Sequence, residues 1–438
     1  MILAGAATAD ITPGAGVTMG GYGARQGRAT GELDPLLVRA LVVSDGRREV
    51  AVAVCDLLGV GSDLVRQARD LIASECSIAP DHVLIGATHT HSGPAGIRPR
   101  EDAAYVAVTA RKIAGAVDVA RRRLEPVVLK SGTATVPSVS LNRRDPEGPV
   151  QQDVHVLVFD TTGTGPPVAT VVNFACHATV LEHDNLEFSA DWPGAMNRFV
   201  ERNVGGVSLF VQGAAGDVNP VWSRHDGAEV ARIGGIVGAA VVRLVHEMRP
   251  LDKGQWSINL SWSEDVEVQA VGRLTEELSL AATSRTVEVT RRQRDPADVI
   301  SAELAQLHRR LETLGTDDVL THRQLRARIN ELTVAELIAR AGPARSAQSL
   351  EVQAIRLSEA CAVLALPGEF FVETGRAIVR DAGLPMLLVA GYANGSVGYV
   401  PPAHAYPEAG YEVGISQFGP EAEALVVSAA LETLRGLY

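Results

Sequence analysis

The 438-residue sequence predicts an α/β fold in which mixed sheets are flanked by helices. Apolar runs of strand length alternate with amphipathic stretches of helical length through the first half, and strand-like runs resume near the C-terminal end. Between them, residues 295–342 repeat Leu, Ala, Arg and Glu at helical spacing. We interpret residues 1–438 as a single domain with a helical insertion at about 295–342. A chain of this length could also divide into two intertwined subdomains.

Each element of the first half is predicted from its residue pattern. The strands are runs of aliphatic and β-branched residues, and the helices repeat their apolar residues every three to four positions. In chain order, we predict strands at Ala40–Val43 and Val50–Val54, a helix at Ser62–Ser74, a strand at Val83–Ala87, a helix at Tyr105–Leu124, and strands at Val127–Lys130, His155–Asp160, Val168–Phe174 and Val207–Gln212.

The segment 295–342 is predicted to form a helical hairpin. The helical pattern breaks near Gly315, and a second helix follows Thr321. A structural role, as a lid or a dimerisation element, fits this hairpin better than a catalytic one. Beyond it, strands are predicted at Val352–Leu357 and Ala362–Leu366.

Composition and charge argue against nucleic acid and membrane partners. The 40 basic and 52 acidic residues give a formal net charge of −12, and no run of Lys and Arg is long enough to follow a phosphate backbone. No apolar stretch reaches the length of a membrane span, and Met1–Pro13 lacks the basic start of a secretory signal. The four cysteines are scattered through apolar segments, as is typical of buried thiols in a reducing compartment. We therefore expect a cytoplasmic protein without nucleic acid or membrane partners.

A His-x-His pair ends the most informative strand. The apolar run Val83–Ala87 leads into His89 and His91. In an extended chain, residues two apart point the same way, so both side chains could face one site. Imidazole nitrogen suits zinc. Paired histidines also occur at strand ends without a metal, and this segment alone leaves both interpretations open.

Three further segments carry polar residues where strands end. His177 follows a buried strand, where it is either a core histidine or part of a site. The small residues of Gln212–Pro220 either form a tight turn or let the backbone approach a ligand. Glu369 precedes a helix, where it is either a helix N-terminal charge or a metal ligand. The glycine-rich loop 391–399 contains two tyrosines.

In this order, these segments resemble the neutral/alkaline non-lysosomal ceramidase family. The resemblance begins at Gly5–Thr12 and at Gly20-Gly21-Tyr22 and extends to Tyr411-Glu412, but does not include the helical insertion. It implies a ceramidase-like catalytic core of mixed sheets flanked by helices, with one zinc ion per chain. The zinc ligands that it implies are His89, His177, Glu369 and Tyr399.

The resemblance also implies roles for residues beside the metal. His91 would be an acid/base or oxyanion-stabilising group, and Arg143 would be a cation that orients the substrate. The family carries a serine needed for activity after Gly-Asp-Val, but this chain has Asn219 there. Asparagine can donate a hydrogen bond to an oxyanion but cannot act as a nucleophile. Metal-activated water is therefore the expected nucleophile.

We predict a zinc-dependent amidohydrolase that cleaves the C–N bond of a small soluble amide rather than of ceramide. Asn219, the lack of a membrane-binding stretch and the lack of sequence for a C-terminal immunoglobulin-like domain all favour this substrate class. A zinc-dependent lyase or isomerase and a non-catalytic zinc-binding protein are the alternatives. The oligomeric state stays open, with a homo-oligomer among the options.

Overall fold

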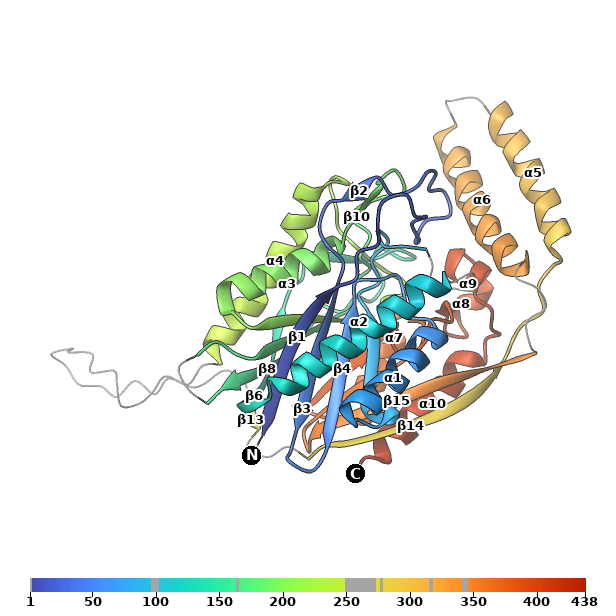
Figure 1. The fold of residues 1–438 in the computed structure, drawn as a ribbon. Helices are drawn as coiled ribbons and strands as arrows, with labels where there is room; N and C mark the ends of the chain where they lie inside the picture. Colours follow the sequence, from blue (N-terminus) through green and yellow to red (C-terminus); the bar gives the residue numbers. More distant parts are fainter. Residues whose placement is uncertain are drawn as a thin grey trace, which may run out of the picture.

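A nine-stranded mixed sheet lies at the centre of the protein (Figure 1). The computed structural model describes residues 2–95, 102–162, 165–248, 273–275, 279–314, 318–340 and 346–438. The described strands run in the order β11-β9-β8-β6-β1-β3-β4-β5, and β13 pairs with β6 beside this path. The pairs β4–β5 and β9–β11 are parallel. The strands are β1 Leu3–Asp10, β3 Leu37–Ser44, β4 Glu49–Cys55, β5 Val83–Ala87, β6 Glu125–Thr135, β8 Asp153–Thr161, β9 Ala169–Phe174, β11 Val207–Gln212 and β13 Arg273–Thr275.

Helices cover one face of this sheet. Successive residues of a strand point to opposite faces, so Val38, Ala40 and Val42 of β3 all reach the same side. They share a hydrophobic core with Leu64 and Trp192, which belong to two of the covering helices. The helices of this layer are α1 Ser62–Cys76, α2 Ala103–Arg122, α3 Asp191–Val204 and α4 Gly227–Glu247.

A second sheet covers the opposite face. Leu41 and Val43 of β3 share a core with Leu357 and Leu388 of this sheet. Its order is β14-β15-β16-β18, with bounds Ala281–Thr290, Ala347–Ser358, Cys361–Ala365 and Met386–Ala390. Its outer face packs against α7 Val372–Ala382 and α10 Ala422–Arg435. Strands β5, β9, β16 and β18 are buried along their whole length, which explains why they are nearly continuous apolar runs.

Two helices leave the body between β14 and β15 and project to one side of it (Figure 1). They are α5 Ala297–Thr313 and α6 Val319–Arg340. Ile300 and Leu304 of α5 pack against Leu332 and Ala335 of α6 in a small core of their own. These helices lie in the segment where the hairpin was predicted, although α6 begins two residues before Thr321, and Gly315 lies outside the described residues.

Short elements join the loops above the sheets. Three two-stranded pairs are β2 Gly31–Glu32 with β10 Glu187–Phe188, β7 Ser140–Asn142 with β12 Val218–Pro220, and β17 Glu369–Phe370 with β19 Tyr399–Val400. The remaining short helices are η1 Pro80–His82, α8 Ala405–Glu408 and α9 Tyr411–Ile415. The register of β17 and β19 sets Glu369 opposite Tyr399.

The predicted α/β class with mixed sheets is confirmed. The strands predicted at Val83–Ala87 and Val207–Gln212 have the predicted bounds, and the other predicted elements lie within a few residues of observed ones. That the whole chain forms a single domain stays a prediction. Within the described residues, no helix is both long and apolar enough to cross a membrane.

Candidate active site

The predicted site residues gather where strands of both sheets end. His89 and His91 follow β5, and His177 follows β9. Asn219 lies just beyond β11, and Glu369 lies just beyond β16. These are the carboxyl ends of parallel strand pairs, where α/β proteins bind ligands. The two sheets face each other, so their ends bring residues distant in sequence to one place.

Three buried histidines form the centre of this site. One ring nitrogen from each of His89, His91 and His177 lies within 4.8 Å of the others. His91 Nε2 is 3.2 Å from His89 Nε2. This group is suited to holding a metal ion, because imidazole nitrogen is a common ligand of zinc and related metals.

Backbone carbonyls orient two of these histidines. His89 Nδ1 is 2.6 Å from Leu58 O, and His177 Nδ1 is 3.1 Å from Val218 O. A carbonyl oxygen only accepts hydrogen bonds, so both Nδ1 atoms carry a proton and both Nε2 atoms present a lone pair. This is the arrangement that outer-shell groups impose on metal-binding histidines.

A carboxylate lies beside these lone pairs. Glu369 Oε2 is 3.3 Å from His89 Nε2 and 3.7 Å from His177 Nε2. Glu369 is only 3% exposed, so its charge is largely removed from water. His177 Nε2 has no hydrogen-bond partner among the described residues. Two imidazole lone pairs and a buried carboxylate that converge in this way fit a divalent metal ion.

Arg143 holds the hydroxyl group of Tyr399. The Arg143 guanidinium donates to the Tyr399 hydroxyl at 2.9 Å, to Glu412 at 2.7 Å and to Gly216 O at 2.8 Å. Burial holds the pKa of Tyr399 well above 10, and Arg143 opposes this shift. A metal would therefore have to favour the phenolate for Tyr399 to be a ligand.

The His-x-His pair converges, but the expected extended backbone is wrong. β5 ends at Ala87, and His89 has a φ of +64°, in the left-handed region. Neighbouring loops hold this turn, because Thr90 Oγ1 donates to Ser189 O at 2.6 Å and the His91 N–H donates to Ala178 O at 3.2 Å. Strained backbone of this kind is typical of functional sites.

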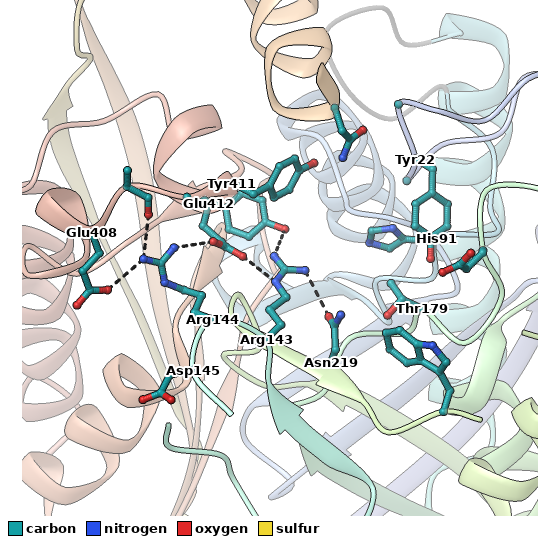
Figure 2. A pocket seen from close by; sticks show the side chains of 18 residues that line it. Tyr22, His91, Arg143, Arg144, Asp145, Thr179, Asn219, Glu408, Tyr411 and Glu412 are labelled. Carbon is teal, nitrogen blue, oxygen red and sulfur yellow. Dashed lines mark hydrogen bonds and ion pairs between the residues drawn. The ribbon is translucent and has the colours of Figure 1, made fainter. Parts of the chain in front are cut away.

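A cavity of about 640 Å³ opens above the histidines. Of the predicted site residues, four line it: His91, Arg143, Asn219 and Tyr399. Figure 2 shows His91 facing Tyr22, and shows Arg143 between Glu412 and Asn219. His91 therefore belongs both to the histidine cluster and to the lining of the cavity.

Asn219 is held by the same arginine. Arg143 Nη1 donates to Asn219 Oδ1 at 3.3 Å. The carbonyl end of the amide thus faces Arg143, which leaves the NH₂ end as a donor for a ligand.

Burial and neighbouring charges set the protonation states of the histidines and of Arg143. Burial, together with the positive charge of Arg143, lowers the pKa of His177 to about 4. Burial also lowers the pKa of His91 well below 6.5. Although burial alone would lower the pKa of Arg143, Tyr399 and Glu412 raise it well above its ordinary value. Near neutral pH His91 and His177 are therefore neutral and Arg143 is charged.

Residues outside the predicted site set support the cluster. Tyr392 stacks on His89 with ring centroids 4.0 Å apart, and its hydroxyl is buried without a partner among the described residues. The Asp191 carboxylate accepts from three backbone N–H groups, and Trp192 Nε1 donates to His177 O at 2.8 Å. Tyr392 belongs to the glycine-rich loop noted in the sequence, but nothing there shows that it meets His89.

These observations define an α/β protein with a buried three-histidine group, suited to a metal ion, below a polar cavity. The model of the family "Neutral/alkaline non-lysosomal ceramidase, N-terminal" matches residues 2–228, just over half of the chain. The chain belongs to this family, and the predicted resemblance is confirmed. The matched segment includes His89, His91, Arg143, His177 and Asn219, whereas Glu369 and Tyr399 lie beyond it.

Individual relatives match part of their own length. The chain is 27% identical over 263 residues to a neutral ceramidase of Mycobacterium tuberculosis (strain ATCC 25618 / H37Rv), a match that spans 50% of this chain and 40% of that protein. It is 27% identical over 252 residues to neutral ceramidase A of Dictyostelium discoideum, spanning 48% of this chain and 35% of that protein. The matched region is therefore less than half the length of either relative.

Two solved structures share the fold over the whole chain. The crystal structure of neutral ceramidase from Pseudomonas aeruginosa superposes with a TM-score of 0.72 at 20% identity, covering 100% of this chain and 74% of that one. A structure described as ceramidase complexed with C2 gives a TM-score of 0.73 at 19% identity and covers 100% of this chain and 75% of that one. At these identities the likeness shows the fold alone.

Proposed function

We propose that the chain is a zinc-dependent hydrolase that cleaves the amide C–N bond of a small soluble substrate. The convergence of two imidazole lone pairs and a buried carboxylate beneath a cavity carries this proposal. His89 and His177 would hold the ion together with Glu369. Tyr399 completes the proposed ligand set, because the β17–β19 register sets it opposite Glu369. One zinc ion per chain is proposed.

The donor set favours zinc among divalent metals. Two imidazoles and a carboxylate are a common zinc set, whereas magnesium and calcium prefer oxygen ligands. When bound, zinc supplies a Lewis acid and lowers the pKa of a coordinated water towards neutrality.

His91 is the proposed proton carrier. Its Nε2 faces the histidine cluster, and its Nδ1 has no hydrogen-bond partner among the described residues. A neutral imidazole has one donor and one acceptor nitrogen, so it can take a proton on one side of the scissile bond and release it to the leaving amine.

Arg143 and Asn219 are the proposed substrate contacts. Glu412 and Gly216 O fix the Arg143 guanidinium, so its charge has one orientation towards the cavity. The Asn219 NH₂ group can donate to the oxyanion that develops on the carbonyl oxygen, and preorganised donors of this kind accelerate acyl transfer. Asn219 cannot replace a nucleophilic serine, which leaves water as the nucleophile.

We further propose a cytoplasmic location. All four cysteines are buried and unpaired. Free thiols persist in a reducing compartment, where disulfides are rare.

Metal content of the purified protein tests the mechanism first. We expect about one zinc per chain in the wild type and loss of zinc in His177→Ala, measured by elemental analysis on protein prepared without chelators. No stoichiometric zinc in the wild type would contradict the proposed mechanism and favour a non-catalytic binding protein.

Isotope labelling separates hydrolysis from lyase or isomerase chemistry. A hydrolase places one oxygen atom of labelled water in the carboxylate product, and mass spectrometry detects it. Turnover without incorporation of the label would favour the lyase or isomerase alternative, because a Lewis acid can also polarise a carbonyl without delivering water.

A further inference from the structure

Helix α6 forms part of the wall of the cavity. Asn330 of α6 lines the same cavity as His91 and Arg143. The loop after Tyr22 packs directly on this helix, since a methyl group placed at Gly23 would lie 3.3 Å from Asn330 Oδ1 and 3.5 Å from Val334 Cγ2. The hairpin of α5 and α6 therefore contacts the N-terminal wall of the cavity.

The hairpin is also tied to the opposite wall. Arg292, just ahead of α5, donates to the carbonyls of Val413 and Gly414 at 2.7 Å each. A side chain at Gly414 would collide with Glu331, so α6 and α9 are in close contact there. Because α9 supplies Tyr411 and Glu412 to the cavity, the hairpin spans both of its sides.

The lining of the cavity is polar and aromatic. Among the described residues that line it, only Ala409 and the glycines lack a polar side-chain atom, and none is Leu, Ile, Val, Met or Phe. A hydrocarbon chain would displace water from the carboxylates and guanidinium groups here, and its apolar contacts would be with aromatic rings and Ala409 rather than with aliphatic side chains. The rings of Tyr22, Trp222 and Tyr411 can instead cover the C–H groups of a compact ligand.

We infer that Asn330 determines specificity, and that the substrate is a hydroxylated amide without a long hydrocarbon chain. Asn330 lines the cavity, and its amide can both donate to and accept from a hydroxyl group of a bound molecule. The carboxylates of Asp145 and Glu182 add acceptors in the same cavity. This inference rests on the proposed function, since it concerns the substrate of the same site.

Two amides that differ only in their hydrocarbon chain test the inference. N-acetyl-2-amino-1,3-propanediol and N-acetylsphingosine both carry an acetamide on an amino diol, and the second adds the alkyl tail. With zinc-loaded protein, and with the second amide kept below its micelle threshold, we expect kcat/KM to be at least tenfold higher for the tail-free amide. A wild-type preference for the tail-bearing amide would overturn the inference while leaving amide hydrolysis in place.

Asn330→Leu, compared with a matched control variant, tests whether Asn330 contributes to substrate specificity. Asn330→Leu should lower kcat/KM for the tail-free amide by about three- to tenfold, the effect of one lost hydrogen bond. Gln324→Leu is the control, because Gln324 is exposed on the same helix and does not line the cavity. Zinc content should stay at the wild-type value in both variants. Equal kcat/KM values for the two variants would contradict the role of Asn330.

If neither amide is cleaved, that outcome counts against the hydrolase proposal. The inference about the substrate can still be tested by measuring the affinity of the protein for each amide by calorimetry. Tighter binding of the tail-free amide than of the tail-bearing one, weakened by Asn330→Leu but not by Gln324→Leu, would support the inference. Tighter binding of the tail-bearing amide would overturn it.

Discussion

Asp191 offers a sharp test of how the loops hold the histidine cluster. It is fully buried, and its Oδ1 accepts from the N–H groups of Val180 and Trp192 while its Oδ2 accepts from that of Leu181. This carboxylate therefore joins the loop after His177 to the start of α3. Asp191→Asn keeps the shape of the side chain. Its φ of +55° is one that asparagine tolerates, so the change adds little backbone strain.

The expected cost follows from the three hydrogen bonds. In Asp191→Asn an NH₂ group replaces one acceptor and faces a backbone N–H, and an unsatisfied buried donor costs roughly 1–3 kcal/mol. The bonds that remain become neutral, and charge-assisted hydrogen bonds are about twice as strong as neutral ones. We expect the free energy of unfolding to fall by roughly 2–4 kcal/mol. Zinc affinity should fall by about 10- to 100-fold, as happens when groups that orient metal ligands are lost.

Urea unfolding and competition with a chromophoric chelator measure these two quantities. Burial raises the pKa of Asp191 to about 6, so assays near pH 7.5 keep the wild-type carboxylate ionised. Asp184→Asn is the control, because Asp184 is exposed in the same loop region. If Asp191→Asn and Asp184→Asn had the same unfolding free energy and zinc affinity as the wild type, the reasoning would be refuted.

Two further predictions concern the histidines. His91→Ala should keep zinc while losing turnover by at least a hundredfold, because in the proposed mechanism His91 moves a proton and does not hold the ion. Loss of zinc in this variant would instead place His91 in the ligand set. In metal-free folded protein, the pKa of His177 is lowered to about 4, whereas in the unfolded chain it is about 6.5. As the pH drops from about 6.5 towards 4, His177 is protonated in the unfolded chain but not in the folded protein, so the free energy of unfolding falls. Burial raises the pKa of Asp191 and Asp217 to about 6, which acts in the opposite direction, so the measured quantity is the difference between the wild type and His177→Gln. From pH 7 to pH 5 the free energy of unfolding of the wild type should fall by about 2 kcal/mol more than that of His177→Gln, measured by urea unfolding. Parallel pH profiles of the two proteins would contradict the prediction.

Burial of both faces does not by itself decide which strands sequence reasoning located, since Met386–Ala390 is buried throughout and was not predicted. Val207–Gln212 is a β-branched and aromatic run between turns, so its bounds were predictable. β1 was missed because Leu3–Asp10 consists largely of Ala and Gly, which have little strand preference. Its small residues are required by packing, since a side chain at Gly5 would collide with the backbone of α2 at Ala120.

The candidate site was predictable in its members but not in its geometry. The spacing of His89 and His91 correctly suggested that their rings meet, but the reason is a left-handed turn that neighbouring loops impose, and no local pattern encodes it. Tyr392 gave no signal, because its contact with His89 joins residues about 300 positions apart. Asn330 could not be placed either, since a helix pattern does not show which part of the body the helix reaches.

The two sheets contribute equally to the proposed ligand set. His89 and His177 extend from the main sheet, whereas Glu369 and Tyr399 belong to a short strand pair that follows the second sheet. An ion held by all four would act as a reversible cross-link between the two halves of the chain. It would stabilise the folded state in proportion to the logarithm of free metal over its dissociation constant, so the docking of the two sheets would depend on metal supply.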